Sequence, residues 1–407
     1  MILDFLFRNS SSGHNKILTT EDLAAYLSKG ASSGAGVNVT PDRAMRYAAV
    51  FACVRVLAES VGQLPLHLYQ TKGERERVKA TDHPLYLVLY SAPNAYQTAQ
   101  EWREWIVACL ALRGNAYCQI IRVRDQVVEL LPIMPGVVTP KQDPRSRVVT
   151  YDITETGGGT VTLPASDVLH LKLFSLDGLM GLSPIGYARE AIGLGIATEE
   201  HGAGLFSRGA APGGVLQSDQ VLTPEVAARL KATWAERHEG SGNSHRVAVL
   251  EQGLKWQAVG MSSEDAQFLE TRKYQRSEVA GLFRVPPHLI GDLERATFTN
   301  IEQQGLDFIT GGLMPYLTRI EQRVAFQLLS AKQRAEYFAK FNVGGLVRGD
   351  MAARGAFYTN QVQNGAMSPN EIRELEDRNP REGGDVFLQP SNMVVSGTAS
   401  PDPAPKK

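Results

Sequence analysis

The sequence predicts an α+β fold, and three patterns support this class. Apolar residues recur at helical spacing in four segments, residues 41–61, 98–112, 184–210 and 223–240. Alternating strand-like runs separated by glycine turns occupy much of the chain between residues 115 and 175. An apolar stripe with steps of three and four residues predicts one long helix over 299–330. We therefore expect one mixed α+β domain over 41–183, followed by helices and a second, smaller β/α unit.

Composition narrows the class of protein. The chain has 407 residues, 43% of them hydrophobic, and a net charge of −1, which suits two or three domains or one core with appendages. Dedicated nucleic-acid binders usually carry a strong basic excess, so any contact with nucleic acid should be local or weak.

Cysteines and apolar runs indicate the compartment. Cys53, Cys109 and Cys118 form no CxxC pattern and leave one residue unpaired, which predicts buried free thiols in a reducing compartment. The start "MILDFLFRNSSS" lacks the basic residues and the apolar length of a signal peptide, and no run reaches a membrane span. A soluble intracellular protein with no membrane contact is expected.

The first domain begins with a helix over 41–61 and an alternating strand, "LPLHLYQT". A second helix over 98–112 has Thr98 as its cap. Its apolar residues Trp102, Trp105, Ile106, Cys109 and Leu110 share one side. The runs "AYCQIIRV" and "QVVELLPI" then predict two strands with Arg124 and Asp125 at their turn. Three further strands are expected in "RVVTYDIT", "TVTL" and "DVLHLKLF".

Glycines interrupt the helical pattern of 184–210. The spacing of Ile192, Ile196 and Leu205 predicts a helix. The same segment also carries Gly186, Gly193, Gly195, Gly202 and Gly204. Each interior glycine costs a helix about 1 kcal/mol relative to alanine. We therefore expect another backbone to pass close to this helix.

Residues 211–259 predict a small β/α unit. "GGVLQ" is a strand, Thr223 and Pro224 start the helix 223–240, and "HRVAVL" and "LKWQAV" form a hairpin around "EQG". About 50 residues seldom have a stable core of their own.

The next helix, 262–283, carries a capping box in Ser262 and Asp265. Its middle, 270–278, is polar nearly all round, so it bridges solvent or faces polar groups on more than one side. Pro286 and Pro287 then end the helix before a short apolar run.

Glycines and a proline also interrupt the long helix 299–330. Gly311, Gly312 and Pro315 predict a kink in its middle. "EYFAKF" is a strand, and a helix from Met351 to Gln363 follows with Asp350 as its cap.

A last short helix follows in "SPNEIRELEDR". Ser368, Pro369 and Glu371 give it a complete start signal. The tail 396–407 should be disordered.

No enzyme motif is present in the sequence. It has no GxxxxGK[ST], GxSxG, HExxH or dinucleotide-binding fingerprint, and its histidines are scattered, so no catalytic residue, metal site or cofactor is predicted. "GLGIA" and "GAGLF" lie inside a helical pattern and indicate packing. The acidic pairs Glu199–Glu200 and Glu264–Asp265 are interpreted as solvated or capping carboxylates.

The order of these parts, with several local motifs, resembles phage portal proteins of the HK97 type. The resemblance covers residues 40–390. The motifs that carry it are "SAPN…T…EW", "LRGNAYCQIIR", "GLSPIGYAREAIGLG", "FSRGAAPGGVL", the continuous run from "VLEQGLKWQAV" to "FTNIEQQ", and "VRGDMAARGAFY" with "MSPNEIRELEDRNP".

The resemblance implies a portal fold with an α/β wing, two stem helices, a small β/α clip, a long kinked helix and a short helical crown. Its expected divisions follow in chain order. They are a flexible N-terminal segment 1–40, wing 41–183, stem helix 184–209, clip 210–259, second stem helix 260–285, tunnel loop 286–299, wing 300–348, crown 349–380 and a mostly disordered tail 381–407.

The resemblance also implies a function. Twelve copies would form a ring at a unique capsid vertex, a conduit through which double-stranded DNA is packaged and ejected without regard to sequence. The implied partners are the large terminase, a head–tail adaptor and the major capsid or scaffold protein. The implied location is the virion, with the host cytoplasm during assembly. The stem glycines would then let neighbouring subunits approach closely.

Particular residues follow from the implied divisions. The residues expected at the DNA channel are Pro287, His288, Leu289, Ile290, Leu293 and Arg295. Arg272, Lys273 and Arg276 either face DNA or form salt bridges between subunits. On the clip helix, Glu225, Arg229, Lys231 and Arg237 are expected to meet terminase or adaptor.

Two other classes of protein are alternatives to a portal. A packaging nuclease or ATPase requires a carboxylate cluster for metal or a P-loop, and the sequence offers neither. A tail or capsid structural protein shares the non-enzymatic character, and localisation at a unique vertex would distinguish the portal from it.

Overall fold

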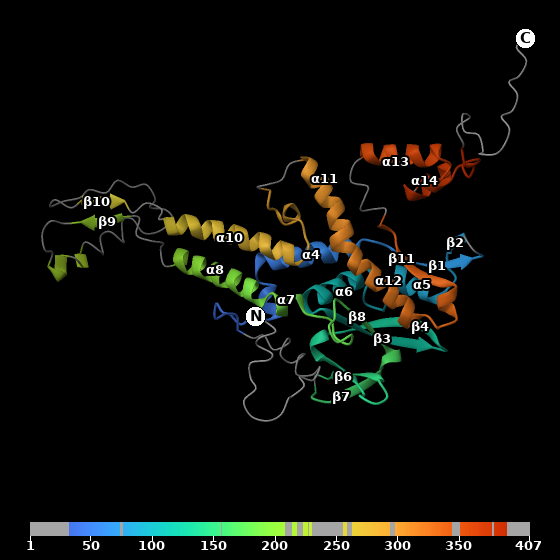
Figure 1. Ribbon diagram of the computed structural model, residues 1–407, viewed down its shortest axis with the longest axis horizontal. Helices are drawn as coiled ribbons and strands as arrows, with labels where there is room; N and C mark the ends of the chain where they lie inside the picture. Colours follow the sequence, from blue (N-terminus) through green and yellow to red (C-terminus); the bar gives the residue numbers. More distant parts are fainter. Residues whose placement is uncertain are drawn as a thin grey trace, which may run out of the picture. The chain divides into compact units, whose positions relative to one another are not determined.

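The computed structural model describes residues 32–73, 76–155, 157–207, 214–217, 223–226, 228–229, 255–258, 263–293, 298–343, 351–376 and 378–388. These residues divide into two compact units, one ending at Lys340 and one beginning at Phe341. Helices and antiparallel sheets both occur in the first unit, so the predicted α+β class is confirmed (Figure 1).

Helices make up much of the first unit. They are α3 (Pro41–Ala44), α4 (Ala48–Gly62), α5 (Pro84–Tyr90), α6 (Ala99–Arg113), α7 (Pro184–Tyr187), α8 (Arg189–Ser207), α10 (Ser263–Leu282), α11 (Phe298–Asp307) and α12 (Met314–Leu328). The sequence patterns predict all of these regions except α5, whose short run has too few turns to show a helical period.

The strands form four small sheets. The sheet orders are β11-β1-β2, β10-β9, β4-β3-β8 and β5-β6-β7. The strands are β1 (Leu66–Lys72), β2 (Glu76–Lys79), β3 (Asn115–Val123), β4 (Gln126–Ile133), β5 (Val138–Gln142), β6 (Val149–Thr154), β7 (Thr160–Pro164), β8 (Val168–Lys172), β9 (Gly214–Gln217), β10 (Lys255–Ala258) and β11 (Tyr337–Phe341).

Helices α4 and α6 pack together at the centre of the first unit (Figure 1). Leu57, Trp102, Ile106 and Leu110 are fully buried between and beside them. Thr98 caps α6, as the sequence predicts, and Glu101 completes a capping box with it. The three cysteines are buried and free, also as predicted.

Arg103 on α6 is buried, although the sequence gives no sign of it. Its guanidinium donates to Gly62 O at 2.9 and 3.1 Å and to Leu89 O at 3.3 Å. These carbonyls lie at the ends of α4 and α5, where helices have unsatisfied acceptors and partial negative charge. Burial lowers the pKa of Arg103 to about 10. One side chain therefore ties three helices together.

The prediction of one helix over 41–61 is wrong in one respect. The chain forms α3 and α4 with a break at residues 45–47, where Tyr47 is extended with φ −77° and ψ 117°. Tyr47 is buried, and its ring lies against Gly195 of α8. A tertiary contact thus overrides local helical periodicity.

The β3–β4 hairpin follows the prediction closely. Its turn residues Arg124 and Asp125 have φ of 50° and 65°. Positive φ at both central residues of a two-residue loop defines the type I′ turn, which matches the twist of paired strands. β8 pairs with the other edge of β3 in antiparallel register, with His170 opposite Tyr117.

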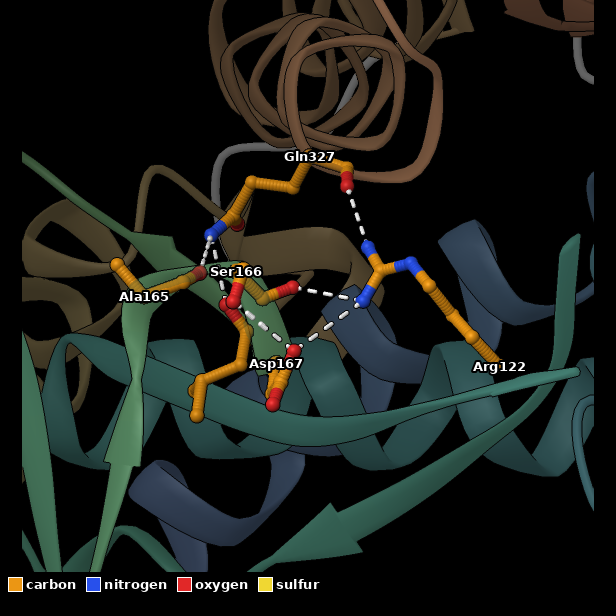
Figure 2. A network of polar contacts seen from close by, with 6 residues as sticks. Arg122, Ala165, Ser166, Asp167 and Gln327 are labelled. Carbon is orange, nitrogen blue, oxygen red and sulfur yellow. Dashed lines mark hydrogen bonds and ion pairs between the residues drawn. The ribbon is translucent and has the colours of Figure 1, made fainter. Parts of the chain in front are cut away.

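Helix α12 is fastened to this region by a polar network that Figure 2 shows. Gln327 Nε2 donates to Val168 O at 2.6 Å and Ala165 O at 3.4 Å. Its Oε1 accepts from His170 N at 3.0 Å. Arg122 on β3 donates to Ser166 O at 2.8 Å and Gln327 O at 3.2 Å. The network lets a helix pack on a strand end that would otherwise leave polar groups unpaired.

The long helix is irregular where its glycines predict a kink. α11 is followed by a π-helical segment, η4 (Phe308–Leu313), and then by α12. A π segment is an identified cause of helix kinks. Gly312 allows it here, because a Cβ at that position would lie 2.8 Å from Phe308 Cδ2 and 3.0 Å from Arg284 O.

The second unit contains α13 (Met351–Gln363) and α14 (Pro369–Leu375). Ser368 and Glu371 form the predicted capping box of α14. Asn370 bonds to Arg381 N and O and to Asp385, at 2.8 to 3.0 Å. The expectation of a mostly disordered tail from 381 therefore fails for 381–388, which fold back onto α14. The predicted cap Asp350 lies outside the described residues.

Candidate functional site

Helices α8 and α10 run side by side and form the frame of the candidate site (Figure 1). Ile192, Ile196, Val279 and Ala280 are buried. Gln275, the one buried residue in the polar segment 270–278, donates from Nε2 to Thr198 Oγ1 at 3.3 Å. The predicted polar helix therefore presents most of its middle to solvent and a single amide to its neighbour.

Two glycines of α8 let other side chains of the same protein pack closely against the helix. A Cβ at Gly193 would lie 2.3 Å from Ser33 Oγ, and one at Gly195 would lie 2.8 Å from the Tyr47 ring. Another part of the protein therefore does pass close to the helix at these two positions, as the sequence predicts. In both cases the described neighbour belongs to the same chain. The expected close contact of these glycines with a neighbouring subunit stays a prediction.

The basic residues of α10 all have partners within the chain. Arg272 lies 3.9 Å from Glu199 of α8, and Lys273 lies 3.6 Å from Glu270. These pairs are about half exposed, so each contributes at most about 1 kcal/mol to the free energy of unfolding. Arg276 donates to Ile290 O. The three cations therefore lie on one helix, two of them beside acidic groups. Contact with DNA and salt bridges between subunits both stay predictions for them.

Helix α10 ends in a Schellman motif before the two prolines. Val285 N donates to Ala280 O at 2.9 Å, and Arg284 N donates to Gly281 O at 3.1 Å. Arg284 has φ 55°, in the position where glycine is preferred. Its side chain donates to Gly311 O at 3.3 Å, a carbonyl of the π-helical segment. Arg284 therefore joins the end of α10 to the irregular part of the long helix.

The Pro-Pro segment is a compact turn. Pro287–Ile290 form a 3-10 helix, η3, that ends at Gly291 with φ 80°. Arg276 binds the Ile290 carbonyl, Ser277 Oγ lies 3.3 Å from Asp292 Oδ2, and η3 contacts α4. The turn is thus held by α10 and α4 together.

The predicted channel residues differ in exposure. Ile290 is buried at 7% exposure, whereas Leu289 is 40% and Leu293 is 63% exposed. His288 Nδ1 lies 2.8 Å from Gln304 Oε1 of α11. Pro287 lines a cavity of about 560 Å³ with Gly311 and Gly312. Arg295 lies outside the described residues.

A second cavity of about 600 Å³ lies along α4, α8 and α10. Small residues line one side of it: Ala48, Ala49, Ala52 and Gly195. Glu199, Glu270, Arg272, Lys273 and Arg276 line the rest. Gln275 also lines it, and its Oε1 is buried and accepts no hydrogen bond within the described part of the chain. This groove between the helices is a surface that sequence patterns do not predict, because it requires three separate helices to meet.

The clip residues are only partly described. β9 and β10 pair in antiparallel fashion, with Trp256 opposite Leu216, which confirms a strand at "GGVLQ" and one at "LKWQA". Glu225 and Arg229 are helical and exposed. Lys231, Arg237 and the "HRVAVL" strand lie outside the described residues.

The described residues contain no group of three His, Cys, Asp or Glu side chains arranged to hold a metal ion. Within that same part of the chain, no helix is both long and apolar enough to cross a membrane.

Comparison with known proteins identifies the family. The family model for phage portal proteins matches residues 48–377. The portal protein of Enterobacteria phage HK97 is 32% identical over 362 residues, which cover 88% of this chain and 84% of that protein. The probable portal protein of Streptomyces phage phiC31 is 34% identical over 388 residues, with 92% and 84% covered.

A solved structure agrees with this assignment. A chain in the neck of a native gene transfer agent particle, computed with C12 symmetry, superposes with a TM-score of 0.59 at 26% identity. The match covers 84% of this chain and 94% of that chain. The family match over most of the sequence and two relatives above 30% identity show that the chain belongs to the phage portal protein family.

Proposed function

We propose that this protein is the subunit of a ring at one capsid vertex, through which double-stranded DNA enters during packaging and leaves during ejection. The observation that carries the proposal is family membership over residues 48–377. The related neck chain comes from a particle computed with twelvefold symmetry, which supports twelve copies here. Closed cyclic rings require two different complementary faces on each subunit.

The near-zero charge suits a conduit. Each phosphate contact strengthens binding in a salt-dependent way, so a channel with many such contacts would hold DNA rather than let it slide. On α10 the cations lie beside Glu199 and Glu270, which limits their attraction for phosphate. Sequence-independent passage of DNA therefore fits the mixed charge of this helix.

One face of the ring contact is the groove along α4, α8 and α10. Its small side chains leave space for a neighbouring subunit, and the free Oε1 of Gln275 offers that subunit a hydrogen-bond acceptor. A buried acceptor without a partner is destabilising in an isolated chain, typically by about 1–3 kcal/mol. Binding of a neighbour's donor would remove this penalty.

The turn around η3 is proposed to reach the channel with Leu289 and Leu293, which are exposed, together with His288 and Pro287. Arg295 follows in the same segment. Ile290 is buried and packs in the interior of the turn. The exposed clip residues Glu225 and Arg229, with Lys231 and Arg237 nearby in sequence, are proposed to meet the large terminase or a head–tail adaptor.

The remaining parts of the proposal follow from the same role. The ring also contacts the major capsid or scaffold protein, is located in the virion and assembles in the host cytoplasm. The protein acts without catalysis, cofactor or metal. ATP hydrolysis or magnesium-dependent DNA cleavage by the purified chain would contradict this part.

Electron microscopy of the purified protein tests the proposal. We expect rings, with a mass of roughly 0.5 MDa for twelve chains of 44.4 kDa. Labelled subunits should occupy one vertex of each particle. A protein that stays monomeric at high concentration, or label spread over all vertices or along the tail, would contradict it.

A further inference from the structure

A cavity of about 990 Å³ lies at the junction of β8, β6 and α12, apart from the stem helices and the Pro-Pro turn. Its lining includes Lys172, Arg323, His170 and Tyr151. We propose that this cavity binds an oxyanion, a carboxylate or a phosphate group, between the guanidinium of Arg323 and the ammonium of Lys172.

A chain of buried hydrogen bonds fixes the position of Arg323. Asn115 Nδ2 donates to Gly181 O at 2.8 Å, which leaves Asn115 Oδ1 as an acceptor. His170 Nε2 lies 3.0 Å from that Oδ1, so Nε2 carries the ring proton and Nδ1 is an acceptor. Tyr151 Oη lies 3.2 Å from Nδ1 and donates to it. The direction of every bond in this chain is therefore determined.

Arg323 is the last member of this row of hydrogen-bonded side chains. Having donated to His170, the Tyr151 oxygen is free to accept from the guanidinium of Arg323, with which it interacts. Arg323 Nε also donates to His170 O at 2.7 Å. Asn115, Tyr151 and His170 are at most 3% exposed, so they are held rigidly. An arginine oriented in this way presents its remaining N–H donors to the cavity, as planar recognition of an oxyanion requires.

Both cations and carboxylates line the cavity: Arg122, Lys172 and Arg323 on one side of the balance, Asp125, Asp167 and Asp177 on the other. Among the described residues, neither Arg323 nor Lys172 forms an ion pair with a carboxylate, and Lys172 Nζ donates to Gly178 O. Burial and the charge of Arg323 lower the pKa of Lys172, and the carboxylate of Asp177 opposes this shift. Two cations that repel each other across a cavity create a site for an anion.

Two of the three acidic residues of the cavity, Asp167 and Asp177, already have partners within the protein. Asp167 lies 3.5 Å from Arg122, as Figure 2 shows. Asp177 accepts from Leu179 N and Met180 N, each at 2.8 Å. Asp125 is exposed in the hairpin turn.

Aromatic packing extends the positive site toward solvent. The Phe326 ring is 60% exposed, and the guanidinium carbons of Arg323 and Arg334 lie 5.5 and 5.0 Å from its centroid. Arg334 therefore adds a second guanidinium on the outer side of the ring, which would attract an incoming anion.

The test measures binding of inorganic phosphate to the full-length protein at constant ionic strength, from the broadening of its ³¹P resonance. We expect saturable binding by the wild type and at least tenfold weaker binding by Arg323→Gln and by Lys172→Gln, because each removes a charge-assisted contact. Arg55→Gln is the matched control, since Arg55 is an exposed arginine on α4 paired with Glu59. It should bind phosphate like the wild type.

Competition distinguishes the two chemical sources. If acetate or succinate displaces phosphate at similar concentration, the site takes carboxylates, such as an acidic side chain of a partner. If they do not, it is selective for phosphate groups.

Absence of saturable binding to the wild type would overturn the proposal. Wild-type affinity in both variants would also overturn it. Should Arg323→Gln fail to fold, Lys172→Gln alone decides, because Lys172 is only half-buried.

Tyr151→Phe tests the positioning chain. The variant keeps both cations but removes the hydroxyl that links His170 to Arg323. We expect several-fold weaker phosphate binding. We also expect changed imidazole ¹⁵N shifts for His170, a readout that a merely structural role for the ring would not move. Unchanged affinity and unchanged shifts would contradict the positioning role.

Discussion

Single buried or half-buried polar residues determine much of the local geometry in this protein. Arg103 joins α6 to the ends of α4 and α5, and Gln327 joins α12 to β8. His170 connects Asn115 to Tyr151. Each satisfies backbone or side-chain groups that burial would otherwise leave unpaired. None is recognisable from its sequence neighbours, because a histidine or arginine in a strand or helix is usually exposed.

His170 gives the fold a pH dependence. Burial, with Arg323 and Lys172 nearby, holds the pKa of His170 well below its usual 6.5. The folded protein therefore keeps the ring neutral while the unfolded chain binds a proton. The stabilisation is fully present above about pH 6.5 and is lost as the pH falls below that value, by up to about 1.4 kcal/mol per pH unit.

The variant His170→Gln checks this contribution. Its free energy of unfolding should fall less than that of the wild type between about pH 7.5 and 5.5 in urea titrations. An equal fall in both proteins would show that His170 does not supply the dependence.

Adjacent residues in the Pro-Pro turn should respond differently to the same charge. Ile290→Asp places a carboxylate in a buried site and should destabilise the fold by about 3 kcal/mol or more. Leu289→Asp and Leu293→Asp change exposed side chains and should alter stability by about 0.5 kcal/mol or less. Thermal unfolding of the three variants measures the contrast, and equal losses would contradict the burial pattern.

At the scale of elements, the end of α10 packs against the irregular segment of the long helix. Arg284 adopts a left-handed conformation and donates to Gly311 O, while its own carbonyl lies close to Gly312. A π segment widens the helix by one residue per turn, so the carbonyls around it need other partners. This packing therefore depends on both elements.

The two glycines of the π segment offer a matched test. A Cβ at Gly312 would meet Phe308 and the Arg284 carbonyl, so Gly312→Ala should destabilise the protein by about 1–3 kcal/mol. A Cβ at Gly311 has nothing within 4 Å, so Gly311→Ala should be neutral or stabilise by up to about 1 kcal/mol. Urea unfolding measures both, and a larger loss at Gly311 would contradict the packing.

At the scale of the whole molecule, the separation of buried and exposed residues predicts separate effects on assembly and DNA passage. Leu289 and Leu293 lie outside the core of the turn, and the groove beside Ala48 lies on another surface. Changes at the turn should therefore leave the ring intact, while changes in the groove should not.

The turn is tested by the double variant Leu289→Asp with Leu293→Asp. It should assemble into rings in negative-stain images but package DNA poorly, because two carboxylates at the proposed channel would repel phosphate. Packaging at the wild-type level would contradict the placement of the turn at the channel.

The groove is tested by Ala48→Trp, which fills it from the exposed side of α4. The variant should fold with a near-wild-type melting temperature, yet sedimentation should show monomers. Rings of normal size would exclude this groove from the subunit contact.

The sequence by itself determined the elements that depend on local signals. The cap at Thr98, the capping box at Ser368, the turn at Arg124 and Asp125, and the irregularity at Gly311 and Gly312 follow from residues within one or two turns of each other. The order of these elements also indicated the family.

Only the tertiary structure decided which side chains are buried and with what. It divided 41–61 into two helices through the contact of Tyr47 with Gly195 and placed Ile290 inside while Leu289 stays outside. It also brought Lys172 and Arg323 to one cavity. These outcomes depend on contacts between residues more than a hundred positions apart, and periodicity within a segment carries no information about such contacts.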